Sequence, residues 1–297
     1  MAGKYGEIRQ PLHIDNRFDY VLFSNEFKER YIGVWQVRPI PIPPEIEATD
    51  NKRLSRYPKA HPETMLAEYD ASLYIDANIQ IADQWVYDRI IELSQKGIDY
   101  AGVKLVATGR DCIYRHSYDM CIKRLEHDYN AIIQMHALRI EGFPEHYGLN
   151  ENNIIYRRHN EKMKLVDELW WDWIVKYSYR DQFSYMYCLW KYSIENHYFL
   201  PIGEAAFSSS HFTYVSHEKI QETAKKRCVS VGRSEKWRYW CRSLSEWHYN
   251  HYCEQWVRLS KKSHSIFWLY FYGYVSFMLY AIPILFQIVV RKMKSFQ

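Results

Sequence analysis

The sequence predicts an α/β fold, in which helices cover a β-sheet, and two observations carry that prediction. Short runs of β-branched and aromatic residues alternate along the chain with longer segments whose apolar residues recur at helical spacing. The chain has 297 residues, of which 47% are hydrophobic, so it can bury one large core or two smaller ones. Folds of this class bind their ligands outside the carboxyl ends of the strands.

The predicted strands are short runs that proline, glycine or charged residues interrupt. They lie at residues 19–24, at 31–37, in the run that ends at Asp76, at 103–107 and at 153–156. The first two, DYVLFS and YIGVWQV, are rich in the residues that strands favour. Four prolines between residues 39 and 44 then exclude a regular element.

The predicted helices carry apolar residues three and four positions apart. They span residues 64–69, 83–95, 111–138 in two pieces, 163–177 and 180–192. The helix at 83–95 ends where Gly97 supplies a stop signal, and the helix at 163–177 gathers its apolar residues on one face.

Two polar side chains follow the predicted strand LYI at the point where it stops. Asp76 and Asn78 stand there, two positions apart, before apolar residues resume at Ile79. Aspartate and asparagine are common where a chain turns, and their oxygens are also the ligands that Mg²⁺ and Mn²⁺ prefer. The residues alone leave both interpretations of the pair open.

A series of motifs between residues 5 and 200 resembles one protein family. The motifs, in the family's order, are FDYVLFSNEF, GVWQVRPIPIP, SRYPKAHPETMLAEYDASLYIDANIQI, GRDCIY, GFPEHYGLNENNIIYRRHN and LWWDWIVKYSYRDQFSYMYCLW. The family is the glycosyltransferase-like domain, formerly catalogued as a domain of unknown function, of bacterial surface-polysaccharide loci and plant mucilage-related Golgi proteins. The resemblance implies a GT-A-like nucleotide-sugar-binding sheet flanked by helices. In such a sheet a short acidic motif at a strand end holds a divalent metal, Mn²⁺ or Mg²⁺, on the donor diphosphate.

The chain departs from the family pattern in three places. Ala77 stands where the family usually has glycine, and Asn78 is a weaker metal ligand than a second aspartate. The family's Pro-His pair is reversed here as His61 and Pro62. The family also opens with an apolar strand before the segment that GKYGEIRQP matches, whereas residues 1–18 hold no apolar run of four. We therefore expect the sheet of this chain to lack that first strand.

The resemblance and the side-chain chemistry together indicate which residues would bind the metal and the nucleotide-sugar donor. Asp76 and Asn78 are the predicted metal ligands, and Asp76 is also a predicted catalytic residue. His211, in SSSHFTYVSH, is the candidate for a third ligand, because two hard ligands leave an ion under-coordinated. Basic and polar side chains that could hold the donor phosphates and sugars complete the set: Arg56, Lys59, Arg110, Asp111, Asn152, Asn153, Arg180 and Gln182.

The RDQ motif at residues 180–182 is a hallmark of the family, and analogous Asp-Gln pairs imply that it faces the acceptor. Asp181 is accordingly the second predicted catalytic residue. It could take a proton from an acceptor hydroxyl in an inverting reaction, or orient the sugar in a retaining one. Aspartate at a helix start is equally typical of an N-terminal cap, and one residue can do both.

The C-terminal part of the sequence predicts a membrane anchor. Residues 266–290 run for 25 positions without a charge, and a helix needs about 20 apolar residues to cross a bilayer. Residues 225–262 hold ten lysines and arginines against three glutamates, with tryptophans between them. That pattern favours a helix on an anionic membrane over a nucleic-acid contact, although an ordinary solvated helix stays open. The larger positive charge before the span favours a cytoplasmic N-terminal domain.

These features divide the chain into a glycosyltransferase-like domain at 1–215, a basic aromatic-rich region at 216–262, a transmembrane helix at 263–290 and a short basic tail at 291–297. We expect a glycosyltransferase that moves a sugar from a nucleotide-sugar donor to a glycan or lipid-linked acceptor, with no nucleic-acid partner. The alternatives are a membrane-bound metal-dependent hydrolase of a lipid substrate and a non-catalytic sugar-binding module. Six cysteines without a Cys-x-x-Cys pair agree with a reducing compartment.

Overall fold

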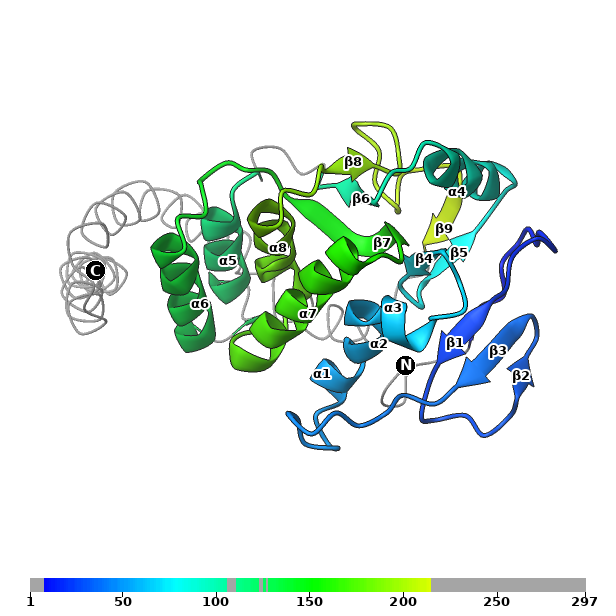
Figure 1. Cartoon of the computed structure of the whole chain (residues 1–297), viewed down its shortest axis with the longest axis horizontal. Helices are drawn as coiled ribbons and strands as arrows, with labels where there is room; N and C mark the ends of the chain where they lie inside the picture. The colour runs from blue at the N-terminus through cyan, green and yellow to red at the C-terminus, as the bar shows by residue number, and fades with distance from the viewer. Residues whose placement is uncertain (1–7, 106–110, 123–124, 127, 215–297) are drawn as a thin grey trace, which may run out of the picture. The chain divides into compact units, whose positions relative to one another are not determined.

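The computed structural model describes residues 8–105, 111–122, 125–126 and 128–214 (Figure 1). All of them belong to the first of the two compact units into which the chain divides, Met1–Gln221. The regions predicted at 216–262, 263–290 and 291–297 lie outside the described residues. Within the described part of the chain, no helix is both long enough and apolar enough to cross a membrane.

A four-stranded mixed sheet forms the centre of the fold. Its strands, in spatial order, are β4 (Ala71–Ile75), β7 (Asn150–Arg158), β6 (Tyr100–Lys104) and β8 (His197–Tyr198). The long strand β7 runs antiparallel to both β4 and β6, and β8 runs parallel to β6. Because β4 and β7 are antiparallel, the carboxyl end of β4 lies beside the start of β7.

Two smaller sheets accompany the central one. One has the order β1 (Val21–Phe23), β3 (Trp35–Arg38), β2 (Tyr31–Ile32), with β1 parallel and β2 antiparallel to β3. The other pairs β5 (Ile79–Ile81) with β9 (Phe212–Tyr214). A tight turn, in which the N–H of Ile79 donates to the carbonyl of Asp76 at 2.9 Å, carries the chain from β4 directly into β5.

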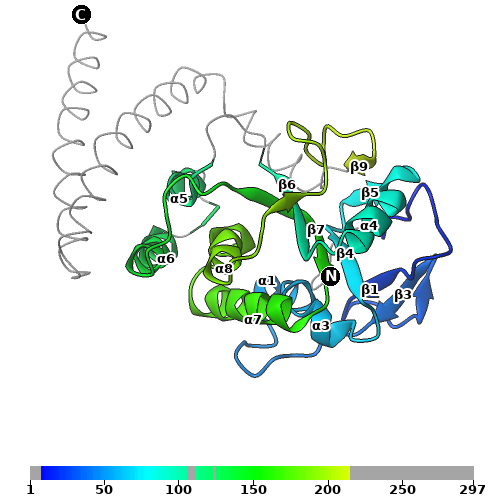
Figure 2. The same cartoon turned by 45° about the horizontal axis from the view of Figure 1, so that its top comes forward.

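Helices cover both faces of the central sheet, as Figure 2 shows for α4 on one side and α7 with α8 on the other. They are α1 (Asn51–Leu54), α2 (Tyr57–Ala60), α3 (Pro62–Met65), α4 (Trp85–Gln95), α5 (Ile113–Ile122), α6 (Asp128–Ile140), α7 (Glu161–Lys176) and α8 (Tyr185–Lys191), with a 3₁₀ turn η1 (Asp181–Phe183). Successive side chains of β7 point to opposite faces of the sheet. Ile154 and Tyr156 pack with α4 on one face, and Ile155 packs with α7 on the other. The mixed α/β fold predicted from the sequence is therefore confirmed at this level.

The prediction of a single strand at residues 31–37 is wrong. Residues 31–37 form a hairpin of β2 and β3 instead of a single strand. Gly33 turns the chain with a φ of 60°, a conformation that side-chain-bearing residues rarely adopt. The side chain of Gln10 holds this turn, because its Oε1 accepts from the N–H of Val34 and its Nε2 donates to the carbonyl of Ile32.

Other boundaries differ for local reasons. The helix predicted at 64–69 is α3, which starts earlier because Pro62 suits a first helical position. The helix predicted at 180–192 is split at Ser184 into η1 and α8. The strand predicted at 153–156 is part of the longer β7, and the one at 103–107 overlaps β6 and runs on into residues outside the described part. The short elements α1, α2, β5, β8 and β9 were not expected from the sequence.

Candidate functional site

Four of the predicted site residues meet at the carboxyl end of β4, and we call them the Lys59 cluster: Arg56, Lys59, Asp76 and Asp181. The ammonium of Lys59 donates a hydrogen bond to Oδ2 of Asp181 and lies 4.0 Å from Oδ1 of Asp76. Nε of Arg56 lies 3.5 Å from the same oxygen of Asp181. Two cations and two carboxylates from distant parts of the chain thus share one place.

A buried ion pair holds Lys59 in position. The short helix α2 begins with Pro58 near its start and presents Lys59 toward the sheet, where its side chain is only 2% exposed. Arg157 of β7 donates from Nη2 to the carbonyl of Lys59 at 2.6 Å and from Nη1 to Asp167 of α7 at 2.8 Å. The ammonium also lies 4.6 Å from the ring centroid of Tyr74, within the range of a cation–π interaction.

Asp181 is buried and ionised. Burial by itself would raise the pKa of its carboxyl, but the charges of Lys59 and Arg56 and the hydrogen bond from Lys59 outweigh burial and hold the pKa below its ordinary value. The indole N–H of Trp170 donates to the carbonyl of Asp181 at 2.9 Å and ties η1 to α7. A carboxylate with a lowered pKa is a weak proton acceptor, so Asp181 is better suited to hold charge and position than to act as a general base.

Asp76 both turns the chain and presents its carboxylate. Its N–H donates to the carbonyl of Asn153 at 2.9 Å, which continues the β4–β7 ladder, and its carbonyl closes the turn to Ile79. The hydroxyl of Tyr74 donates to Oδ1 at 2.7 Å. The side chain nevertheless remains 39% exposed, so a ligand can reach it.

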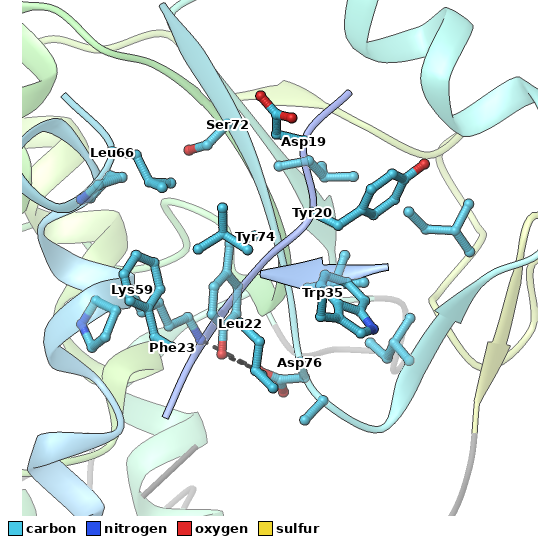
Figure 3. A pocket seen from close by; sticks show the side chains of 18 of the residues that line it. Asp19, Tyr20, Leu22, Phe23, Trp35, Lys59, Leu66, Ser72, Tyr74 and Asp76 are labelled. Carbon is cyan, nitrogen blue, oxygen red and sulfur yellow. Dashed lines mark hydrogen bonds and ion pairs between the residues drawn. The ribbon is translucent and has the colours of Figure 1, made fainter. Parts of the chain in front are cut away.

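A pocket of about 680 Å³ opens beside these residues, and Arg56, Lys59, Asp76 and Asn78 line it. Figure 3 shows Lys59, Tyr74 and Asp76 gathered at one end of the pocket and Asp19 and Ser72 at the other. Six basic side chains and two acidic ones line its wall: Arg9, Arg17, Lys52, Arg56, Lys59, Arg157, Asp19 and Asp76. Asp15, Asp181 and Asp167 pair with three of these basic side chains, Arg17, Lys59 and Arg157. With these carboxylates counted, an excess of one positive charge remains, which suits an anionic ligand.

The structure places His211 away from this group. Its Nδ1 hydrogen-bonds Oδ2 of Asp83 at 2.8 Å, and its ring stacks on Trp85 with centroids 4.0 Å apart. His211 is not among the residues that line the pocket. The expected third ligand is therefore not brought beside Asp76.

Three further predicted residues are Arg110, Asp111 and Arg180. Arg110 lies outside the described residues, and Asp111 hydrogen-bonds His146 at 2.8 Å on the surface. Nε of Arg180 donates to the carbonyl of Leu125 at 2.9 Å, which makes it a contact between loops.

Three polar side chains extend from the cluster along the start of β7. The side-chain amide of Asn153 donates to Glu151 at 3.0 Å, while the backbone carbonyl of Asn153 accepts from the N–H of Asp76. Nε2 of Gln182 donates to the carbonyl of Asn150 at 3.3 Å, so the RDQ motif reaches the same strand. Asn152 is buried, and its Nδ2 has no hydrogen-bond partner among the described residues.

A divalent ion fits Asp76 and Asn78 only if it shares its coordination shell with a ligand. Among the residues that the structure describes, no group of three or more His, Cys, Asp and Glu side chains could hold an ion. The exposed Asp76 carboxylate and the adjacent Asn78 offer two oxygen ligands on the pocket wall. Mg²⁺ commonly binds through one or two carboxylates together with substrate phosphates, and that mode agrees with this pair.

Sequence reasoning missed the residues that support the cluster. Tyr74, Arg157, Asp167 and Trp170 contact or position its members, yet none was predicted as a site residue. Tyr74 could have been found, since it lies two positions before Asp76 and therefore on the same face of β4. The Arg157–Asp167 pair has no such local signal, because the two residues come from a strand and a helix.

Comparison of the sequence with protein-family models and with curated proteins, and of the fold with solved structures, finds no match.

Proposed function

We propose that this chain is a GT-A-type glycosyltransferase, anchored in a membrane, that moves a sugar from a nucleotide-sugar donor to a glycan or lipid-linked acceptor. The observation that carries the proposal is the meeting of Arg56, Lys59, Asp76 and Asp181 at one end of a positively lined pocket. The family resemblance of the sequence motifs supports the same reading.

The chemistry of the donor fits this arrangement. The diphosphate of a sugar nucleotide is anionic, and negative charge builds on it as the nucleotide departs. Arg56 and Lys59 would supply positive charge at that point. Asp76 and Asn78 would hold a divalent ion, Mn²⁺ or Mg²⁺, which when bound acts as a Lewis acid on the diphosphate. Tyr74 would keep the Asp76 carboxylate oriented through its hydrogen bond.

The role of Asp181 follows from its surroundings. Both of its cationic neighbours and its lowered pKa favour a carboxylate that stays ionised. Such a group can orient a sugar hydroxyl by accepting a hydrogen bond, and it can set the position of Lys59 and Arg56. Of the two roles expected for Asp181, this favours orientation over proton abstraction.

The alternative functions have less support from the geometry. A metal-dependent hydrolase of the kind considered would use a histidine beside Asp76, whereas His211 pairs with Asp83. A non-catalytic sugar-binding module would share the same pocket and differ only in lacking turnover, so the experiment has to measure both binding and product.

The decisive experiment is a screen of sugar nucleotides against the purified full chain, with and without Mn²⁺. We expect at least one uridine or guanosine diphosphate sugar to raise the melting temperature in the presence of Mn²⁺ and to be consumed when acceptor is added. Asp76→Asn should remove the metal-dependent shift, whereas Asp172→Asn, an exposed acid on α7, should retain it. If every sugar nucleotide leaves the melting temperature unchanged, the transferase proposal fails; a shift without turnover assigns the binding module instead.

A further inference from the structure

Glu151 of β7 is an acidic residue near the Lys59 cluster that does not line the pocket of the donor site. The strands β4 and β7 are antiparallel, and Asp76, which follows β4, donates its N–H to the carbonyl of Asn153 at 2.9 Å. Side chains of residues that lie opposite each other in an antiparallel pair point to the same face of the sheet. The side chains of Asp76 and Asn153 therefore share one face.

Two contacts connect Glu151 with the Lys59 cluster. Nδ2 of Asn153 donates to Oε2 of Glu151 at 3.0 Å, and the two residues stand two positions apart, as residues on one face of a strand do. On the other side, Gln182 of the RDQ motif donates to the carbonyl of Asn150, the residue before Glu151, at 3.3 Å. Glu151 is thus linked to the cluster both through Asn153 and through Gln182.

The strand β7 bulges at this place. Gly102 of β6 pairs with Ile155, whereas the next residue, Val103, pairs with Glu151. Residues 152–154 of β7 therefore lie opposite no residue of β6. Bulges occur often next to active sites, where they change the direction in which a side chain points.

Two buried amide atoms of this bulge have no hydrogen-bond partner among the described residues, Nδ2 of Asn152 and Oδ1 of Asn153. A buried polar atom without a partner costs free energy, and a bound ligand can supply the missing bond. Oδ1 of Asn153 belongs to the amide group that donates to Glu151. A hydroxyl that donates to this oxygen would therefore lie close to the carboxylate of Glu151.

The surroundings of Glu151 differ from those of Asp181. Among the residues that the structure describes, no lysine or arginine forms an ion pair with Glu151, and burial raises the pKa of its carboxyl above the ordinary value although Asn153 donates to it. A carboxylate with a raised pKa is the better proton acceptor of the two. The charged side chains on the neighbouring elements contact other groups: Lys104 of β6, Asp76 after β4, and Lys59 with Asp181.

We propose that Glu151 is the general base of the sugar transfer and that the reaction inverts the configuration of the anomeric carbon. This inference rests on the proposed function. The acceptor oxygen forms a bond to the anomeric carbon while the bond from that carbon to the diphosphate oxygen breaks. The electron pair leaves with the diphosphate, beside Arg56 and Lys59, and the acceptor proton passes to Glu151.

The position of Glu151 agrees with such a step. In an inverting displacement the base acts on the side of the sugar opposite the leaving group. The cations that would hold the leaving diphosphate, Arg56 and Lys59, line the pocket, whereas Glu151 lies outside its wall, beyond Asn153. Asp181, which is paired with both cations, keeps the role of orienting them and the sugar.

The variant Glu151→Gln tests the base in the full chain. The probes are UDP-glucose, UDP-galactose and GDP-mannose with Mn²⁺, with octyl glycosides as acceptors and with water as the acceptor where none is added; released nucleoside diphosphate is measured. We expect kcat to fall at least about a hundredfold, because the amide cannot take the proton. The donor KM and the rise in melting temperature caused by the donor should stay unchanged. The matched control Glu168→Gln, an exposed acid on α7, should retain turnover.

Two measurements on the unaltered chain need no variant. Since the base has to be unprotonated, kcat should fall as the pH is lowered through the raised pKa of Glu151, and the residual turnover of Glu151→Gln should lack this dependence. Nuclear magnetic resonance of the freshly released or transferred sugar should show the anomer opposite to that of the donor.

The outcomes separate this inference from the proposed function. Turnover of Glu151→Gln within threefold of the unaltered chain, a product of retained configuration, or loss of the donor-induced shift in the variant overturns the assignment of the base while the transferase stands. If no sugar nucleotide raises the melting temperature of the unaltered chain, or if a bound donor is never consumed, the proposed function fails and the base assignment fails with it.

Discussion

Lys59 and Asp181 lie in direct contact although 122 positions separate them in the sequence. Their hydrogen bond joins α2 to η1 beneath the carboxyl end of β4, and it places a buried ammonium between two carboxylates. The cluster therefore has a structural role that can be measured apart from any reaction.

Replacement of Lys59 by methionine is expected to destabilise the fold by about 3 kcal/mol, because it leaves the carboxylate of Asp181 buried with Arg56 as its remaining cation. Urea unfolding measures the change. Combining Lys59→Met with Asp181→Asn removes the buried negative charge as well, and we expect the double variant to be more stable than Lys59→Met alone. A double-mutant cycle with no coupling between the two positions would contradict the ion pair.

The stability that Asp181 contributes should depend on pH in one direction. Its pKa is lowered in the folded protein, so the carboxylate stays ionised there while the unfolded chain takes up a proton near pH 4. The contribution is therefore fully present above about pH 5 and is lost as the pH falls below about 4. The difference in unfolding free energy between the protein and Asp181→Asn should be constant from neutral pH to about 5 and should shrink below that. A difference that grows on acidification would show that Asp181 is not held ionised.

Asp76→Asn is expected to abolish metal-dependent transfer while the fold is kept. The amide retains the size of the carboxyl group and an oxygen that can accept from Tyr74, but it loses the charge that a divalent ion requires. We expect donor turnover to fall at least about a hundredfold, as it does when a charge-stabilising group is removed. The melting temperature should match that of Asp172→Asn within error; a large drop would mean that Asp76 acts through folding.

Arg157→Met should be among the most destabilising single changes, at about 3–5 kcal/mol, because it leaves Asp167 buried without its cation and frees the carbonyl of Lys59. The neighbouring Arg158 is a matched control. Its side chain is 41% exposed and lies 4.0 Å from Asp99, so Arg158→Met should cost less than about 1 kcal/mol. Equal effects of the two changes would remove the argument that Arg157 anchors α2.

The predicted anchor can be tested by fractionation. Full-length protein should sediment with membranes and resist extraction by salt, whereas the chain without residues 263–297 should be released or should stay attached only at low salt. The residual attachment would come from the basic residues between 225 and 262, which contribute roughly 1 kcal/mol each on an anionic surface. Full-length protein in the soluble fraction without detergent would refute the anchor.

Local patterns in the sequence predicted much of the fold and one part of the site. The helix 163–177 and the strand before Asp76 follow from apolar spacing within a few residues, and both are present as α7 and β4. The hairpin at Gly33 was missed because the strand propensity of YIGVWQV dominates its neighbourhood. The side chain that secures the turn belongs to Gln10, more than twenty positions away.

The partners of charged residues were the least predictable feature. Lys59 was one basic residue among many until the fold brought it to Asp181, and His211 was one of 13 histidines. The bond of His211 to Asp83 spans 128 positions, and no local pattern carries that information. Residue types and strand ends indicate which chemical groups a site can contain. Which charged residues pair with one another depends on the three-dimensional fold of the whole chain.

The turn that leads from Asp76 into β5 has a consequence for how a ligand could be located. The carbonyl of Asp76 accepts from the N–H of Ile79, and the strand β5 that follows has three residues and pairs with the equally short β9. The hydrogen-bonded ladder behind the carboxylate is therefore short. Such amides exchange with deuterated solvent through small opening motions. A molecule bound to Asp76 restrains those motions, so slower deuterium uptake in the peptide containing Ile79 would mark occupancy of the site before any product is known.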